Sequence, residues 1–158
     1  MKYSFVFIFV LLFTACDYFN VKKTSSEAIL KEELETFNWN NVDEYPSFTI
    51  CDSVLSKVDK KACFQETITT NITDFLQKEM IVVSQDIHDT LVLEFQVSKQ
   101  GMLRLLESRV DSVTLQEIPN IKELLNRSLD TLPKIYPAIK RGQQVTTEFN
   151  LPIIISVN

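Results

Sequence analysis

The C-terminal segment of the chain alternates apolar and polar side chains with a period of two residues. One phase of this alternation consists of Val145, Thr147, Phe149, Leu151, Ile153, Ile155 and Val157. A period of two places these side chains on one face of a β-strand, so the fold must contain a sheet with one covered face. Pro152 lies within the segment and has no N–H group. We therefore expect this strand to lie at the edge of the sheet or to contain a bulge.

A second alternating segment predicts a hairpin earlier in the chain. Residues 91–97 alternate Leu, Leu, Phe and Val with other side chains, which is typical of a strand with one buried face. Residues 99–101 end in Gly101, which can adopt positive φ, and they predict a turn. Residues 102–110 then form the returning strand.

Apolar residues recur at helical spacing in two further segments. The first stripe consists of Ile68, Ile72, Phe75 and Leu76, which predicts a helix between residues 62 and 80. The second helix begins near Pro119 and stops at Pro133, and its stripe consists of Ile121, Leu124, Leu125, Leu129 and Leu132. The order helix, strand, strand, helix, strand predicts an α+β fold. We expect a small antiparallel sheet of about three strands with two helices packed on one face.

The N-terminus predicts export and lipidation. Lys2 is followed by an apolar run over 5–13, and Thr14-Ala15 precedes Cys16. This pattern is a signal peptide over 1–15, too short to span a bilayer, with a lipobox at Cys16. Lipid on Cys16 would anchor the chain to a membrane. The alternative is an ordinary signal peptide with an incidental cysteine.

Residues 16–44 are expected to form the lipidated tether, with a short helix over 27–37, and residues 45–158 the folded domain. Removal of residues 1–15 takes one lysine and leaves 15 basic against 21 acidic residues, a net charge of −6. An acidic domain without a basic patch argues against nucleic-acid binding.

Two cysteines remain beyond the lipobox. Cys51 and Cys63 are a disulfide candidate in an exported protein. The alternatives are two buried thiols, or one reactive thiol beside a silent one. With His88 as the sole histidine, these residues do not complete a tetrahedral metal site, so we expect no metal and no cofactor.

The residue pattern gives no catalytic set. His88 could be a general base or a metal ligand, but the simpler interpretation, an exposed loop histidine, is favoured. No G-x-S-x-G segment is present, and the two glycines of the chain are too far apart for a phosphate loop. We therefore expect a protein that is not an enzyme.

Four segments of the chain carry a family resemblance: 45–48 with Cys51 and Cys63-Phe64, then 93–101, then 132–138, and finally 142–153. In this order they resemble the C-terminal domain of TonB-type proteins of the kind common in Bacteroidetes. The resemblance covers about residues 45–157 and implies the TonB-like α+β fold in αββαβ order. It also strengthens the expectation of a Cys51–Cys63 disulfide. Energy transducers of this family have an uncleaved membrane helix and a Pro-rich spacer, and we expect neither in this chain.

The resemblance implies protein binding in the cell envelope. An edge strand can pair with an extended peptide, so we place partner contact along the C-terminal strand. The candidate residues are Val145, Thr147, Phe149, Leu151, Ile153 and Ile155. The expected partner is an envelope protein or a TonB-dependent receptor, met in the periplasm or at the cell surface, from an anchor in the inner or outer membrane. The alternative is a structural or scaffolding lipoprotein without a peptide ligand, in which this strand is simply core.

Overall fold

The computed structural model describes residues 37–54 and 56–157, which all belong to one compact unit of the chain. The signal peptide and Cys16 lie outside this range. So does the helix expected over 27–37, except for Phe37, which belongs to a strand. No helix within the described ranges is long and apolar enough to cross a membrane.

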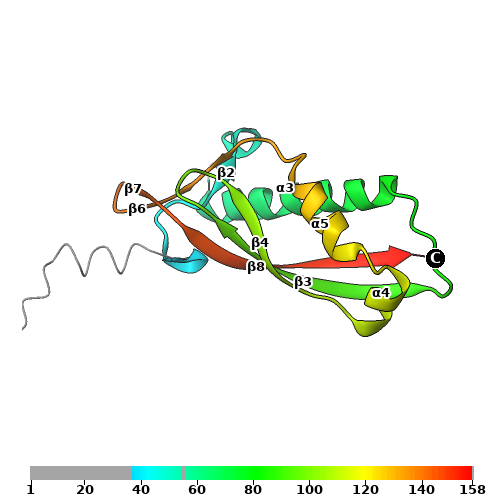
Figure 1. The fold of residues 1–158 in the computed structure, drawn as a ribbon. Helices are drawn as coiled ribbons and strands as arrows, with labels where there is room; N and C mark the ends of the chain where they lie inside the picture. The colour runs from blue at the N-terminus through cyan, green and yellow to red at the C-terminus, as the bar shows by residue number, and fades with distance from the viewer. Residues whose placement is uncertain (1–36, 55, 158) are drawn as a thin grey trace, which may run out of the picture. The chain divides into compact units, whose positions relative to one another are not determined.

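The main sheet has four strands in the order β1-β8-β3-β4 (Figure 1). Its strands are β1 (Phe37–Asn38), β3 (Ile87–Val97), β4 (Leu103–Arg109) and β8 (Thr147–Val157). The two long strands, β3 and β8, pair antiparallel from Ile87 opposite Val157 to Val97 opposite Thr147. β4 pairs antiparallel with the other side of β3 through one register shift, and β1 pairs in parallel with the start of β8. The architecture is therefore α+β, as the sequence predicts.

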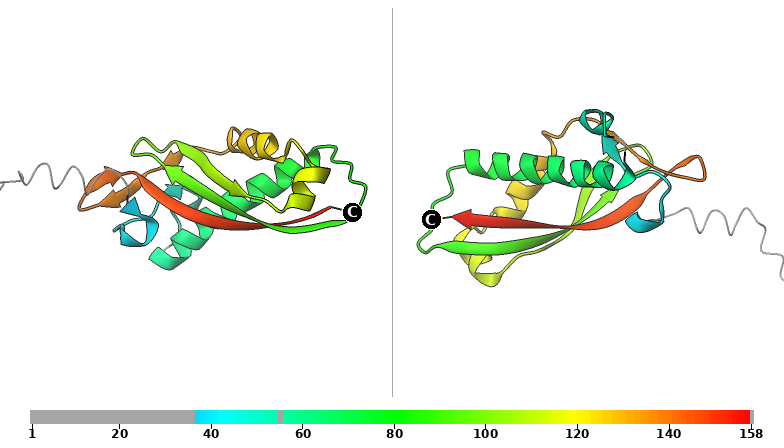
Figure 2. Two further views of the ribbon diagram at one scale, coloured as in Figure 1. Left: turned by 60° about the horizontal axis from the view of Figure 1, so that its bottom comes forward. Right: turned by 180° about the vertical axis from the view of Figure 1, so that it is seen from behind.

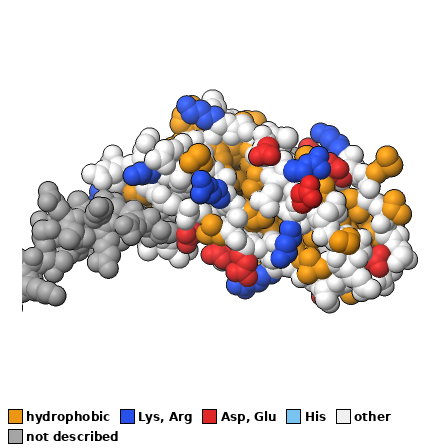
Figure 3. All heavy atoms as spheres, in the orientation of Figure 1, with side chains coloured by type: hydrophobic (Ala, Val, Ile, Leu, Met, Phe, Trp, Pro, Cys, Tyr) orange, Lys and Arg blue, Asp and Glu red, His pale blue; other side chains and the backbone are white. Residues whose placement is uncertain are grey.

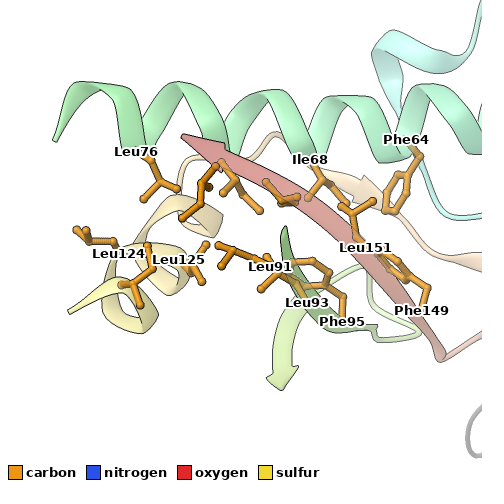
Figure 4. Packing of buried hydrophobic residues seen from close by; sticks show 14 of the residues in the cluster. Phe64, Ile68, Leu76, Leu91, Leu93, Phe95, Leu124, Leu125, Phe149 and Leu151 are labelled. Atoms are coloured by element: carbon orange, nitrogen blue, oxygen red, sulfur yellow. The ribbon is translucent and has the colours of Figure 1, made fainter. Parts of the chain in front are cut away.

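Three helices accompany the sheet in the described part of the chain: α3 (Lys57–Lys78), α4 (Ser112–Glu117) and α5 (Ile121–Leu129). The apolar stripes of α3 and α5 meet the side chains of β3 and β8 in one core (Figure 4). Full burial of a Leu, Ile or Phe side chain stabilises a fold by about 1.5–3 kcal/mol. This core therefore fixes both helices on the same face of the sheet.

The start of α3 follows from local hydrogen bonding. The Ser56 hydroxyl oxygen accepts from the backbone N–H of Asp59 at 3.0 Å, which caps the first turn. From there Phe64, Ile68, Ile72 and Leu76 recur every four residues and are buried. The helix is longer at its N-terminus than the apolar stripe alone predicts, because its first turn is polar and exposed.

Two small two-stranded sheets and two 3-10 helices complete the described fold. The small strands are β2 (Ser47–Phe48) with β5 (Ile135–Tyr136), and β6 (Ala138–Lys140) with β7 (Gln143–Val145). The 3-10 helices are η1 (Trp39–Asn41) and η2 (Thr49–Cys51). Arg141 and Gly142 both have positive φ in the turn between β6 and β7, which matches the twist of a tight hairpin.

The structure corrects three details of the sequence prediction. The main sheet has four strands rather than three, and one of its pairings is parallel. A third helix, α4, follows β4 because the Asp111 side chain caps it by accepting from the N–H of Val113 at 2.8 Å. The alternation of burial continues through Thr146, but the strand is interrupted there, and Val145 belongs to the β6–β7 hairpin and not to the main sheet.

The folded domain also begins earlier than residue 45. Trp39 is 4% exposed, and its ring lies 4.2 Å from that of Phe149, centroid to centroid. Val42 is buried against Ala138 and Val145. Residues 37–44 are therefore part of the core rather than of a tether.

Candidate functional site

One edge of β8 is unpaired over most of its length. β8 pairs with β3 along one side throughout, but on its other side it pairs with β1 only at Thr147 and Glu148. From Asn150 to Val157 no described strand pairs with this side, and we call this stretch the open edge. In the view from behind, β8 lies at the margin of the sheet and α3 runs beside it (Figure 2).

The position of Pro152 indicates which backbone groups face outward. Pro152 lies opposite Val92 in an unbroken β3–β8 register. Because proline has no N–H to donate, this register indicates that residue 152 directs its backbone away from β3. Alternate residues of a strand share one direction, so Asn150, Ile154 and Ser156 direct their N–H groups toward the open edge. This agrees with an edge position for Pro152, and the bulge of the sheet lies between β3 and β4 instead.

The side chains singled out from the sequence point into the protein. Val145, Thr147, Phe149, Leu151, Ile153 and Ile155 are each at most 8% exposed. Those of β8 cover the core under α3 and α5, while that of Val145 packs in a separate small cluster. A partner at β8 would therefore meet backbone groups and the even-numbered side chains. Among these, Ile154 is 76% exposed.

A groove of about 250 Å³ opens where the C-terminal half of α3 faces the end of β8. We call it the apolar groove. Its apolar lining includes Leu76, Ile118, Ile121 and Ile155, and Thr73, Gln77, Glu79 and Ser156 contribute polar atoms. Exposed hydrophobic side chains continue on this end of the domain (Figure 3), including Met80 and Val82 in the segment between α3 and β3. Such a surface suits an aliphatic side chain of a ligand.

A second hollow of about 620 Å³ lies where β1 leaves β8, and we call it the polar recess. It is lined by Asn38, Trp39, Asn40, Lys61, Gln65, Glu94, Glu148, Phe149 and Asn150. The ammonium group of Lys61 already has partners within the domain. Its Nζ donates to the Asn40 Oδ1 at 3.2 Å and lies above the rings of Trp39 and Tyr45.

The carboxylates of the polar recess lie on the sheet face that α3 and α5 leave uncovered. Glu148 accepts a hydrogen bond of 2.8 Å from the Gln96 amide. Glu94 has no hydrogen bond or ion pair within the described residues, and it lies opposite the like-charged Glu107 of β4. The sequence places both glutamates in the polar phase of their strands. Only the register of β3 and β8 brings them to one end of the open edge.

Two buried polar atoms near the start of β8 have no hydrogen-bond partner in the described fold. They are the indole Nε1 of Trp39 and the hydroxyl of Thr147. Buried polar groups without partners cost stability.

His88 lies on β3, where its Nδ1 is 3.0 Å from the Ser156 hydroxyl. Both residues are exposed. No group of three or more His, Cys, Asp or Glu side chains within the described ranges could hold a metal ion. Neither the apolar groove nor the polar recess includes His88 in its lining.

The cysteines of η2 and α3 lie together. Cys51 and Cys63 are paired, with Cα atoms 5.9 Å apart, a separation that a disulfide bond spans. The bond would close a short loop and tie the segment after β2 to the first half of α3.

Comparison of the chain with known protein families, with curated proteins and with solved structures yields no match. No family is assigned. The resemblance to TonB-type proteins therefore rests on the four sequence segments alone.

Proposed function

We propose that the chain is an envelope lipoprotein, anchored through lipid on Cys16, whose TonB C-terminal-like domain binds a protein partner. In this proposal an extended segment of the partner adds to β8 as a further strand. The observation that carries it is the open edge from Asn150 to Val157, which offers backbone groups beside the apolar groove. Strand addition draws affinity from backbone hydrogen bonds and specificity from pockets for alternate side chains.

The way the fold uses the TonB-like segments supports the resemblance. Phe48 of the first segment pairs with Ile135 of the third. The turn at Gly101, in the second segment, packs against the backbone of the same Ile135. Three of the four segments, although distant in sequence, thus meet at Ile135.

The partner and the binding edge can be tested by affinity capture from membranes of the native organism. The bait is the full-length protein with a C-terminal tag, with and without cross-linking. Ile154→Pro removes an outward N–H and blocks strand addition, whereas Ile154→Thr changes the same side chain and keeps the N–H. Cys16→Ala tests the anchor, because loss of lipidation should release the protein from the membrane fraction.

We expect an envelope protein to be captured by the unaltered protein and by Ile154→Thr, and to be lost with Ile154→Pro. Equal capture by both variants would contradict strand addition at β8. Recovery of the lipoprotein alone, even after cross-linking, would favour a structural role without a peptide ligand.

A further inference from the structure

The two ends of the open edge differ in chemistry. The polar recess, with the carboxylates of Glu94 and Glu148, lies at the Asn150 end. The apolar groove lies at the Ile155 end. A segment bound along the whole edge would meet both, so its sequence must suit both.

At the first end, the alternation of strand side chains determines what a ligand residue meets. A ligand residue opposite Asn150 would point to the same face as Asn150, which is the uncovered face of the sheet. Glu94 is paired with Asn150 across β3 and β8, and Glu148 lies two residues earlier on β8. A long cationic side chain from the ligand could reach both carboxylates.

The charges around this position favour a cation. Glu94 has no partner within the described residues, whereas Glu107, opposite it on β4, is paired with Arg109 at 3.5 Å. The negative charge of this position therefore comes from Glu94 and Glu148. The nearest lining cation, Lys61, is held over the rings of Trp39 and Tyr45. A Lys or Arg side chain from a ligand would therefore complement a site that is negative as it stands.

At the other end, a ligand residue opposite Ile155 would point to the face covered by α3. There it would enter the apolar groove and contact Leu76 and the partly exposed Ile81. An aliphatic side chain fits this surface. A charged side chain would lose hydration there, and the one carboxylate in the lining, that of Glu79, is already paired with Arg127 at 3.4 Å.

We infer that the segment bound at β8 carries a cationic side chain and an aliphatic side chain five residues apart. The spacing is that between Asn150 and Ile155, and an odd spacing places the two side chains on opposite faces, as the recess and the groove require. This inference rests on the proposed strand addition. A second copy of the chain is a poor occupant, because the open edge itself contains no Lys or Arg to meet Glu94 and Glu148.

The inference can be tested with short fluorescein-labelled peptides of alternating Thr and Val. One pair carries a lysine and a leucine five residues apart, in the two possible orders. Matched peptides carry glutamate in place of the lysine, or serine in place of the leucine. Binding to the full-length protein in detergent is followed by fluorescence anisotropy. The protein variants are Ile154→Pro, Ile154→Thr, and Glu94→Gln combined with Glu148→Gln.

We expect one order of the lysine–leucine peptide to bind about tenfold more tightly than its glutamate counterpart, given two partly exposed carboxylates. The double glutamine variant should lose this discrimination while it still binds the peptides. Binding that Ile154→Pro abolishes but that shows no preference for lysine or leucine would overturn the inference and leave strand addition standing. No binding of any peptide would overturn both. If analytical ultracentrifugation shows a dimer that does not bind the peptides, the open edge is occupied by a second copy of the chain, and the inference is overturned.

Discussion

A Cβ atom on Gly101 would overlap the carbonyl oxygen of Ile135. Gly101 has φ +80° in the turn that joins β3 to β4, and Ile135 belongs to β5. The Gly101 N–H donates to the Ser98 carbonyl at 2.9 Å, which fixes the turn. The tip of the central hairpin therefore touches β5 through a backbone contact that only glycine permits.

Gly101→Ala should destabilise the domain by about 3 kcal/mol, because it combines a left-handed backbone for a non-glycine residue with a backbone overlap. Gly142→Ala is the matched control. Gly142 also has positive φ, at +74°, but a Cβ atom added there would meet nothing within 4 Å, so we expect a cost of about 1 kcal/mol. Urea denaturation of both variants measures the difference. Equal costs would show that the contact with Ile135 is unimportant.

The Cys51–Cys63 bond should stabilise the domain mainly by restricting the unfolded chain. The two cysteines are 12 residues apart, and closure of a loop of this size contributes about 3 kcal/mol in the chain-entropy model. Reduction with dithiothreitol should lower the denaturation midpoint accordingly. The variant with both cysteines replaced by alanine should already have the lower midpoint and should not respond to the reductant. A midpoint of the unaltered protein that dithiothreitol does not change would contradict the bond.

The long elements of the fold were predictable because their patterns are local. The period-two segments became β3 and β8, and the stripe from Ile68 to Leu76 became part of α3. The buried phase of β8 was also correct, since side-chain alternation is fixed by backbone geometry. The short elements were missed because two or three residues cannot show a period. Thus β1 and β5 exist through pairing with distant strands rather than through their own sequence.

Trp39 shows what local patterns cannot reveal. It stands in a polar segment that favours a loop, yet its ring packs against Phe64 and Phe149 in the core. The candidate site could be predicted from the sequence only in part. Pro152 marked an edge strand in advance, whereas Glu94 and Glu148 became neighbours only through the register of two strands that lie far apart in the sequence.

Glu117 should make stability depend on acid pH. Its carboxylate accepts from the N–H of Ser84 at 2.7 Å and from the Ser84 hydroxyl at 2.9 Å. The backbone hydrogen bond, followed by that of the hydroxyl, lowers the pKa of Glu117 from its ordinary value of 4.5. A lowered folded-state pKa contributes stability that is present above pH 4.5 and is lost as the pH falls through the folded-state pKa.

Glu117→Ala should therefore destabilise the domain at pH 7, and the difference from the unaltered protein should shrink below pH 4.5. Thermal unfolding followed by circular dichroism over this range provides the measurement. Glu66→Ala, which removes an exposed glutamate of α3, is the control for the general effect of lost charge. If the Glu117→Ala difference stayed constant with pH, the link between Ser84 and Glu117 would not be what holds this segment.

The direction of the β8 backbone predicts opposite effects of proline at two neighbouring positions. The N–H of residue 153 points toward β3, and the side chain of this residue is buried. Ile153→Pro should remove a ladder hydrogen bond inside the sheet and cost about 3 kcal/mol or more. Residue 154, like Pro152, directs its backbone away from β3, and its side chain is exposed. Ile154→Pro should therefore lower the free energy of unfolding by at most about 1 kcal/mol. Chemical denaturation compares the two, with Ile154→Thr as the control for loss of the side chain. If both prolines unfolded the domain, the N–H of residue 154 would face β3 rather than the open edge, and no strand could add at β8 through it.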